Sequence, residues 1–286
     1  MKEIVVLSGK GGTGKTSIVG SLAALARNKV LVDCDVDAAD LHLLLRPVTR
    51  EKHDFQSGRT AFIEQARCTQ CGLCEEKCRF DAIAGFKVDP VSCEGCGFCR
   101  YICPAEAITM KENLAGEWFI SDTRYGELAH ARLGIAQENS GKLVALVRQK
   151  ARELAEKRKA DYIISDGPPG IGCPVISSLS GANLALLVTE PTLSGQHDLE
   201  RVIGVCRHFE VPAMVCINKY DINRENTQSI ENYCRSRDIP VAALIPFDNV
   251  VTEAMVKGLP VVEYSRDGIS QIITALWENI KASLLK

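Results

Sequence analysis

Eight of the 13 cysteines lie in one short block of the chain and are regularly spaced. Two runs follow the pattern C-x2-C-x2-C-x3-C, and the second repeats the first at an interval of 25 residues. The repeat includes Ala82 and Ile83, which return as Ala107 and Ile108. Cysteine thiolates are soft ligands that suit iron or zinc. Zinc sites usually pair two knuckles across a longer gap, so this spacing favours iron–sulfur ligation over four-cysteine zinc sites.

The duplicated run resembles the bacterial two-cluster ferredoxin. In that family, three cysteines of one run and the last cysteine of the other hold one [4Fe-4S] cluster. Gly72, Gly95 and Gly97 would permit the tight turns between ligands. The family's proline after the fourth cysteine is present as Pro104 but is Arg79 in the first run. The resemblance implies two clusters, one held by Cys68, Cys71, Cys74 and Cys103 and the other by Cys78, Cys93, Cys96 and Cys99.

A glycine-rich loop near the N-terminus has the pattern of a phosphate site. The apolar run 4–7 predicts a buried strand, and residues 17–27 predict a helix. The loop between them, residues 9–16, fits G-x4-G-K-[ST] in the required strand–loop–helix context. Its backbone N–H groups and the helix N-terminus would bind phosphate, Lys15 would reach the β- and γ-phosphates, and the Thr16 hydroxyl would ligand Mg²⁺. The predicted nucleotide contacts are Gly11, Gly12, Thr13, Gly14, Lys15, Thr16 and Ser17.

Lys10 makes this loop unusual. The sequence K-G-G-T-G-K-T resembles the deviant P-loop of the MinD/ParA/Mrp ATPases, a family that includes the nitrogenase iron protein. In that family the first lysine crosses a dimer interface and contacts the nucleotide of the partner subunit. The resemblance implies catalytic roles for Lys10 and Lys15 in an ATP-bridged dimer. The dimer would be a homodimer or a heterodimer with a paralogous ATPase.

Two acidic segments follow apolar runs that read as strands. Asp33 and Asp35 come after the run 30–32, and Asp166 and Gly167 come after the run 162–165. Open α/β sheets bind ligands at the carboxyl ends of their strands. The resemblance implies that Asp35 orients or deprotonates the attacking water, that Asp33 and Asp166 hold Mg²⁺, and that the Gly167 N–H senses the γ-phosphate.

Two later turns point to the nucleotide base. Asn218 follows the predicted strand 213–217, and Pro246 follows the predicted strand 242–245. The resemblance implies that Asn218 contacts adenine and that Pro246 lies near the base. The run from Asn218 to Asp221 also matches the N-K-x-D pattern by which GTPases read guanine, so GTP stays an alternative. The deviant loop favours ATP and ADP.

Composition narrows the class of protein. The chain has 286 residues, of which 46% are hydrophobic and 24% charged, as in ordinary soluble globular proteins. Its net charge of -2 argues against a bulk nucleic-acid binder. No apolar run reaches the ~18 residues of a membrane-spanning helix. The N-terminus lacks a secretory pattern, so we expect a cytoplasmic protein with reduced cysteines.

The order of elements predicts a composite architecture. Buried apolar strands alternate with helices, which is typical of an α/β fold with a doubly wound, mainly parallel sheet, here a P-loop NTPase. The cysteine block predicts an inserted small α+β ferredoxin-like domain. The predicted bounds are 1–50 and 112–286 for the ATPase domain and 51–111 for the insertion. Residues 50–60 and 111–116 are polar and are predicted to be linkers.

Two features outside these motifs leave alternatives open. Cys173 lies seven residues after Asp166, where the nitrogenase iron protein has a cluster-bridging cysteine, yet residues 112–172 contain no second cysteine. A metal or redox role for Cys173 therefore stays one interpretation. The apolar stripe from Ile269 to Leu284 predicts a C-terminal helix, and MinD uses such a helix on membranes. Glu278 offsets part of its basic charge, so we expect packing on its own domain and no stable membrane association.

Together the motifs predict a Mg²⁺-dependent ATPase that also holds iron–sulfur clusters. One hypothesis is that ATP-driven dimer switching serves the assembly or maturation of a metal or iron–sulfur cluster on a client metalloprotein. An alternative is an ATP-gated electron donor to a redox partner, like the nitrogenase iron protein. A third is a MinD/ParA-like positioning ATPase. No nucleic-acid partner is expected.

Overall fold

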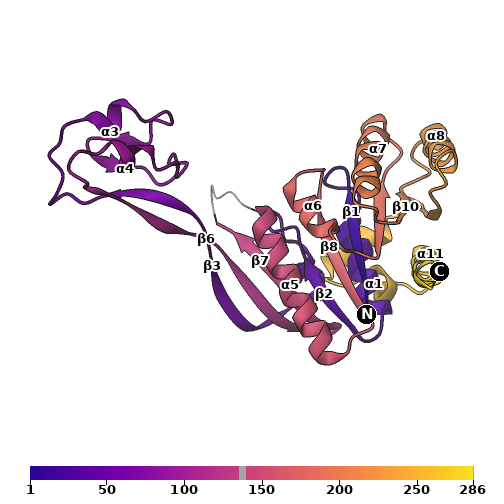
Figure 1. Ribbon diagram of the computed structural model, residues 1–286. Helices are drawn as coiled ribbons and strands as arrows, with labels where there is room; N and C mark the ends of the chain where they lie inside the picture. The colour runs from indigo at the N-terminus through magenta and orange to yellow at the C-terminus, as the bar shows by residue number, and fades with distance from the viewer. Residues whose placement is uncertain (135–139, 286) are drawn as a thin grey trace. The chain divides into compact units, whose positions relative to one another are not determined.

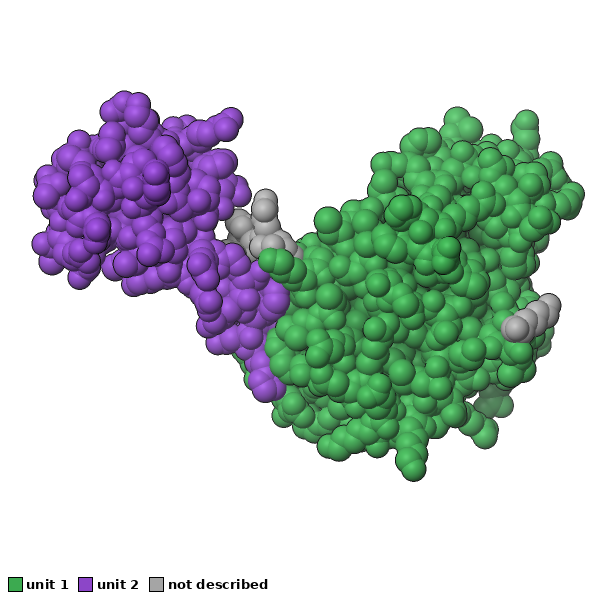
Figure 2. All heavy atoms as spheres, viewed as in Figure 1, with its two compact units in different colours: residues 1–52, 118–132, 140–286 green, residues 53–117, 133–139 purple. Residues whose placement is uncertain are grey.

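The computed structural model of the chain describes residues 1–134 and 140–285. The chain divides into two compact units (Figure 2). The first comprises residues 1–52, 118–132 and 140–286, and the second comprises residues 53–117 and 133–139. Each unit is described by itself below.

The first unit is an α/β sheet with helices on both faces (Figure 1). The strand order is β11-β10-β9-β1-β8-β2-β7-β6-β3. Every neighbouring pair from β11 to β7 is parallel, so the predicted doubly wound, mainly parallel sheet is confirmed. The strands of this unit are β1 (Lys2–Ser8), β2 (Lys29–Asp33), β7 (Gly126–Leu133), β8 (Tyr162–Pro169), β9 (Leu184–Thr189), β10 (Ala213–Asn218) and β11 (Val241–Ile245).

Two apolar layers hold the helices against this sheet. Ile4 and Val6 of β1 face one layer, and Val5 and Leu7 face the other, because successive strand side chains alternate. The first layer includes α1 (Lys15–Leu25), α2 (Leu41–Leu45), α9 (Asn249–Val256), α10 (Val261–Tyr264) and α11 (Ile269–Leu284). The other face carries α5 (Ser140–Arg158), α6 (Cys173–Leu179), α7 (Leu193–His208) and α8 (Arg224–Arg235).

The C-terminal helix α11 uses its apolar stripe inside the first layer. Ile273, Leu276 and Ile280 are at most 3% exposed, and Trp277 packs edge-on against Tyr162 of β8. The expectation that this helix packs on its own domain is confirmed. Among the described residues, no helix combines the length and apolar character needed to cross a membrane.

The second unit contains the cysteine block, parts of two long strands described below, and several short elements. These are α3 (Leu73–Glu76), α4 (Phe98–Ile102) and an antiparallel pair, β4 (Ile83–Ala84) with β5 (Lys87–Val88). Gly72, Gly95 and Gly97 all have positive φ, as their predicted turns require. Among the described residues, the apolar core of this unit is small. One cluster contains Ala61, Ile63, Cys74, Ile83 and Ile108, with other cysteines packed around it, and Ala82 and Ala107 are also buried.

The predicted linkers are wrong. Residues 50–60 lie inside β3 (Val48–Ile63), and residues 111–116 lie inside β6 (Ile108–Thr123). Both strands have 16 residues and are neighbours in the sheet order. Most side chains of β3 are exposed. The sequence of this strand therefore does not show the alternation of apolar and polar residues by which a half-buried strand is recognised. Both strands continue from one unit into the other.

Candidate nucleotide and metal sites

The glycine-rich loop lies between β1 and α1 and is fixed from the side by β10. The Asn218 side-chain amide donates to the Thr13 carbonyl oxygen at 2.8 Å. Gly14 has φ of 88°, and a Cβ there would lie 2.3 Å from Asn218 Nδ2. The loop therefore needs glycine both for its backbone conformation and for this contact. The Thr13 hydroxyl is buried and has no hydrogen-bond partner, which suits a loop that receives a polar ligand.

Lys15 begins α1 and lies among three carboxylates. Its Nζ is 2.5 Å from Asp166 Oδ1 and 3.8 Å from Asp35 Oδ2. Asp33 is also buried, and its carboxylate accepts a hydrogen bond from the Asp35 backbone N–H at 3.1 Å. The strands β2 and β8 are parallel neighbours with Asp33 opposite Asp166, which is why the two acidic segments meet. The structure thus brings together Lys15, Asp33, Asp35 and Asp166, four of the residues that the sequence predicts around the phosphates and Mg²⁺.

Burial sets the electrostatics of this centre. It raises the pKa of Asp33 well above its ordinary value, and the nearby Asp166 adds to that effect. Burial also raises the pKa of Asp35 to about 6. Burial lowers the pKa of Lys15, but the charge and hydrogen bond of Asp166 outweigh it, so the Lys15 pKa is raised. One ammonium among three acids leaves excess negative charge that a hard cation such as Mg²⁺ would neutralise.

Oxygen donors for Mg²⁺ are present but do not enclose an ion by themselves. Thr16 lies in the first turn of α1, beside Lys15. Among the described residues, no three His, Cys, Asp or Glu side chains converge on the position of a single metal ion. Mg²⁺ usually takes only one or two carboxylates and completes its shell with water and phosphate oxygens. Asp33, Asp166 and Thr16 fit that kind of site.

Lys10 is held by residues that the sequence motifs did not identify. Its Nζ lies 2.7 Å from Glu190 Oε1 and donates to the hydroxyls of Thr192 at 3.3 Å and Ser194 at 3.1 Å. Lys219 Nζ is 3.4 Å from the other Glu190 oxygen. Burial raises the pKa of Glu190, but Lys10 and Lys219 outweigh burial, so this pKa is lowered. The ion pair between Glu190, which follows β9, and Lys10 could not be predicted from the sequence motifs.

Gly167 and Asn218 have structural uses besides the roles implied for them. A Cβ on Gly167 would lie 2.4 Å from Leu7 Cδ2 and 2.8 Å from the Val6 carbonyl oxygen, so β8 needs glycine to pack against β1. The Asn218 amide is engaged with the loop, as described above. Next to Pro246, the Phe247 N–H donates to Asp221 Oδ1 at 2.7 Å, which joins the two predicted base turns. The base contacts themselves stay predictions.

The remaining loop residues differ in their surroundings. Gly11 has open space where a Cβ would stand, and so has Gly12, whose φ is 79°. Ser17 lies in α1 beyond Thr16, and its hydroxyl contacts Met255 Sδ at 3.3 Å. The predicted nucleotide roles of Gly11, Gly12, Thr13, Gly14, Thr16 and Ser17 rest on the loop motif.

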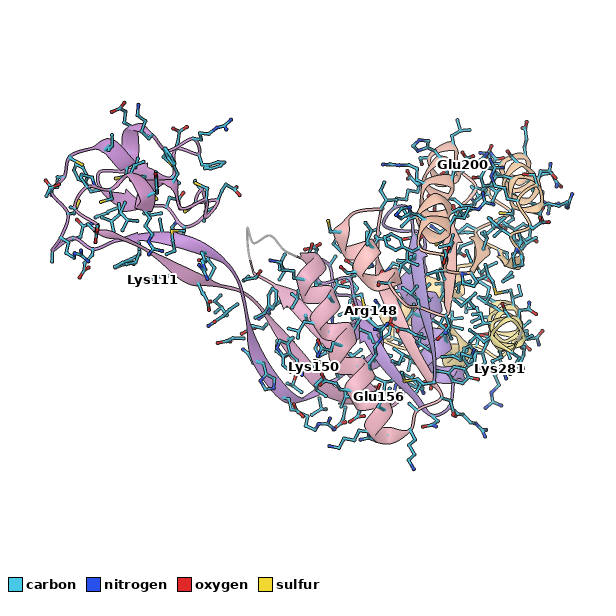
Figure 3. The ribbon with its side chains drawn as sticks, in the orientation of Figure 1. Lys111, Arg148, Lys150, Glu156, Glu200 and Lys281 are labelled. Carbon is cyan, nitrogen blue, oxygen red and sulfur yellow. The ribbon has the colours of Figure 1, made fainter. Side chains whose placement is uncertain are left out.

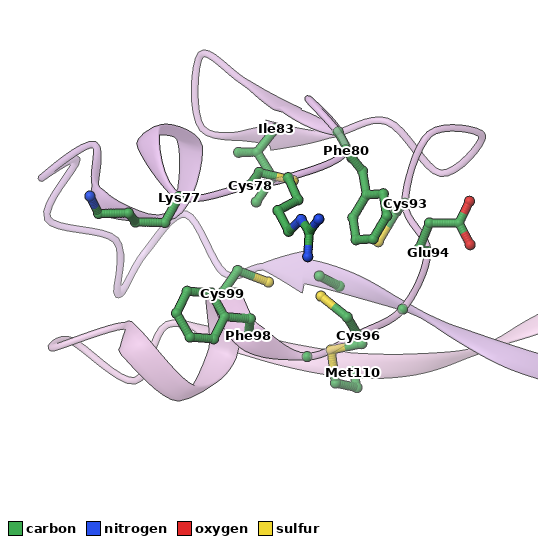
Figure 4. Close-up of a pocket in the computed structure, with 15 residues that line it drawn as sticks. Lys77, Cys78, Phe80, Ile83, Cys93, Glu94, Cys96, Phe98, Cys99 and Met110 are labelled. Atoms are coloured by element: carbon green, nitrogen blue, oxygen red, sulfur yellow. The ribbon is translucent and has the colours of Figure 1, made fainter.

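The cysteines of the second unit gather around two cavities. A cavity of about 380 Å³ is lined by Cys78, Cys93, Cys96 and Cys99, with Phe80, Phe98 and Met110 beside them (Figure 4). A much narrower cavity of about 20 Å³ is lined by Cys68, Cys71, Cys74 and Cys103. We call these groups the Cys78 set and the Cys68 set. Each contains three cysteines of one run and the last cysteine of the other.

The sulfurs of each set influence one another. Burial raises the pKa of Cys74, and Cys68 and Cys103 raise it further. Burial likewise raises the pKa of Cys99, with added effects of Cys93 and Cys96. The absence of a single-ion site among the described residues applies here too. Four cysteine sulfurs are the donor set that iron–sulfur clusters use, and four-cysteine sites also hold zinc.

Cys173 is exposed at the first position of α6. A Cβ on Gly141, near the start of α5, would lie 3.1 Å from Cys173 Cβ, so the two helices approach closely there. None of the other cysteines is joined to it. Its metal or redox role stays a prediction.

The comparisons define the class of this protein. Residues 4–261 match the family described as the CobQ/CobB/MinD/ParA nucleotide binding domain. The chain belongs to this family of nucleotide-binding proteins. An uncharacterized protein of Methanocaldococcus jannaschii is 34% identical, over 98% of this chain and 96% of its own length. A second uncharacterized protein of that organism is 24% identical, over 93% of each chain.

Other relatives carry a function in their names. The septum site-determining protein MinD of Bacillus subtilis is 24% identical, over 91% of this chain and 81% of its own. Among solved structures, MinD of Pyrococcus horikoshii complexed with Mg-ADP has a TM-score of 0.59 at 21% identity. It covers 98% of this chain and 95% of its own. At this identity the likeness shows the shared fold.

Proposed function

We propose that this chain is a Mg²⁺-dependent ATPase that serves the assembly or maturation of a metal or iron–sulfur cluster on a client protein. The observation that carries the proposal is the combination of two sites in one chain. The first site is the glycine-rich loop of the nucleotide-binding family, in which Lys15 lies among three carboxylates. The same chain gathers eight cysteines into two sets of four.

The nucleotide site would divide its work among the residues described above. The loop amides and Lys15 would bind the β- and γ-phosphates of ATP, with Mg²⁺ on Thr16 and the shell of Asp33 and Asp166. Asp35 would orient the attacking water or accept its proton. The raised pKa of Asp35 supports this role, because a general base works best with a pKa near the working pH. The Mg-ADP complex of the Pyrococcus MinD supports the choice of adenine nucleotide.

The second unit would hold two [4Fe-4S] clusters through the Cys78 and Cys68 sets. Such clusters supply reversible one-electron chemistry. The small core of this unit adds a physical reason, since little apolar surface is buried there and all of its cysteines are free of disulfides. Units with so small a core usually depend on disulfides or bound metal for stability. Metal binding would therefore supply folding free energy to this unit.

Dimerisation would connect nucleotide turnover to a client. Lys10 is 30% exposed at the edge of the loop, a position from which it could contact the nucleotide of a second subunit. The second subunit would be another copy or a paralogue. Two different relatives in Methanocaldococcus jannaschii support the paralogue option. The client would be a metalloprotein or a redox partner, with the cluster as cargo in the first case.

Two other functions use the same sites. An ATP-gated electron donor would keep its clusters and release only electrons. The Cys78 and Cys68 sets support this function as much as they support cluster assembly. A positioning ATPase is favoured by the MinD relatives, which match 91% of this chain. The MinC:MinD complex of Aquifex aeolicus, with a TM-score of 0.61, is an assembly of that kind with a partner protein.

The test compares Lys15→Ala and Asp35→Asn with the unchanged protein after anaerobic reconstitution. Both variants should retain iron and sulfide and lose ATP hydrolysis by at least 100-fold, as expected when a phosphate-binding or water-positioning group is removed. Iron-55 transfer to candidate apo-proteins then separates cargo delivery from electron donation, because only delivery moves the label. Normal hydrolysis by Lys15→Ala would refute the proposal.

A further inference from the structure

The two cysteine sets repeat in sequence but differ in their surroundings. The residue after the last cysteine of each run is Arg79 in the first and Pro104 in the second. Arg79 lines the cavity of the Cys78 set, and Pro104 lines that of the Cys68 set. This exchange places a permanent positive charge at one cavity and an apolar ring at the equivalent position of the other.

Arg79 is the charge that distinguishes the two cavities. Lys77, Arg79 and Glu94 line the wide cavity, and no charged residue lines the narrow one. Lys77 Nζ is paired with Glu76 at 2.8 Å. Figure 4 shows the Lys77 ammonium and the Glu94 carboxylate directed away from the cysteine sulfurs. Across the described part of the chain, no ion pair neutralises Arg79.

We propose that the two sets hold centres of unequal reduction potential, with the Cys78 set the more easily reduced because of Arg79. This inference rests on the proposed function, specifically on both sets holding clusters. Reduction of either centre adds one electron, taken from an external one-electron donor, and makes its site more negative by one charge. A nearby guanidinium stabilises that added charge, and an apolar proline does not. The centre in the Cys78 set is therefore reduced first, and the centre in the Cys68 set has the lower reduction potential.

The experiment is a redox titration of the anaerobically reconstituted full chain with dithionite, followed by EPR at poised potentials. Arg79→Gln removes the charge at similar size, and Arg79→Lys keeps it. Pro104→Arg supplies the charge to the other cavity. Lys87→Gln removes an exposed charge that lines neither cavity. Iron and sulfide are measured for every variant before the titration.

The inference predicts two signals with separate midpoints. The comparison is made at the potential at which the Cys78 centre of the unchanged protein is half reduced. At that potential, Arg79→Gln should lower the ratio of reduced to oxidised Cys78 centre about three- to tenfold. Arg79→Lys and Lys87→Gln should leave that ratio unchanged. At the midpoint of the Cys68 centre, Pro104→Arg should raise the ratio of reduced to oxidised Cys68 centre by a similar factor. The midpoint of the Cys78 centre should stay unchanged.

Several results would overturn the inference. Reconstituted protein without two clusters would overturn it together with the proposed function. With eight irons bound, the inference alone fails if Arg79→Gln moves neither midpoint, moves both equally, or moves the lower one. It also fails if Arg79→Lys shifts the midpoint as far as Arg79→Gln does, since the effect would then come from packing and not from charge.

Discussion

At the scale of single residues, two lysines of one loop have different environments. Lys15 is 7% exposed and lies against Asp166, whereas Lys10 is 30% exposed and is shared among Glu190, Thr192 and Ser194. Lys15 is thus fixed within its own subunit. Lys10 must exchange its contact with Glu190 for any partner outside the chain, so Glu190 opposes that movement.

Glu190→Gln should therefore strengthen ATP-dependent dimerisation. A partly exposed ion pair contributes about 0.2–1 kcal/mol, so its loss should lower the dimer dissociation constant up to about fivefold. Sedimentation velocity with a non-hydrolysable ATP analogue measures this constant. Glu200→Gln, a charge removal on the adjoining helix α7, serves as the matched control. Weaker dimerisation of Glu190→Gln would argue that Glu190 positions Lys10 for contact instead of holding it back.

His130 provides a second prediction at this scale. Burial, with a smaller effect of the nearby His42, lowers its pKa to about 4. The Ser121 hydroxyl lies 2.8 Å from His130 Nε2, and Phe119 stacks on the ring. Because the folded chain holds this histidine neutral, the unfolded chain binds the extra proton between pH 6.5 and 4. The contribution of His130 to the free energy of unfolding should then fall by about 1–2 kcal/mol as pH drops from 7 to 5, whereas Asp35, whose pKa is raised to about 6, contributes in the opposite direction.

Urea unfolding of His130→Gln across this pH range measures the effect. The difference in unfolding free energy between the variant and the unchanged protein should change by about 1–2 kcal/mol between pH 7 and 5. His197→Gln, whose side chain is 70% exposed, should show no such change. An unchanged slope in His130→Gln would assign the pH dependence to other groups.

At the scale of elements, helix α5 is fixed to the sheet by a buried carboxylate. Glu3 of β1 accepts from Arg148 at 2.8 Å and from Arg152 at 2.7 Å. Both arginines belong to α5, and Figure 3 labels Arg148 on that helix. Arg148 also donates to the Ser177 carbonyl oxygen of α6. The same helix follows the segment 133–139 of the second unit in the chain. This cluster therefore links the helix after the nucleotide strand β8 to the helix after the cysteine-containing unit.

Glu3→Gln should lower the free energy of unfolding by roughly 3–5 kcal/mol, because Arg148 is 4% exposed and would lose its neutralising charge. Arg152→Gln should cost less than about 1 kcal/mol, since Arg152 is 39% exposed. Urea denaturation of both variants provides the comparison. Equal losses would show that burial does not decide the energetics of this cluster.

The sequence was informative wherever spacing along the chain determines structure. The parallel strands, the loop from Gly9 to Thr16 and the glycine turns between cysteines all depend on residues near one another in the chain. The strand β3 was missed because most of its side chains are exposed, and β6 was missed because its buried and exposed positions do not alternate regularly. Contacts such as Lys10 with Glu190 and Arg148 with Glu3 join residues more than 140 positions apart. Their pairing depends on the packing of the sheet, which no local pattern records.

At the scale of the whole molecule, the account joins two chemistries in one chain. The first unit has the fold and family membership of a nucleotide-binding protein. The second has a small core and cysteines grouped by fours. The two long strands β3 and β6 continue from one unit into the other. We propose that nucleotide binding in the first unit influences the clusters proposed for the second unit.

Anaerobic reductive titration followed by EPR, with and without ATP and Mg²⁺, tests that claim most directly. Metal and sulfide analysis of the same samples establishes what the cysteines hold. The account predicts eight irons per chain, two [4Fe-4S] signals, and a change in their shape or midpoint when ATP and Mg²⁺ are added. Lys15→Ala should show the signals without the change. Zinc in place of iron, or signals that ATP leaves unaltered in the unchanged protein, would contradict the account.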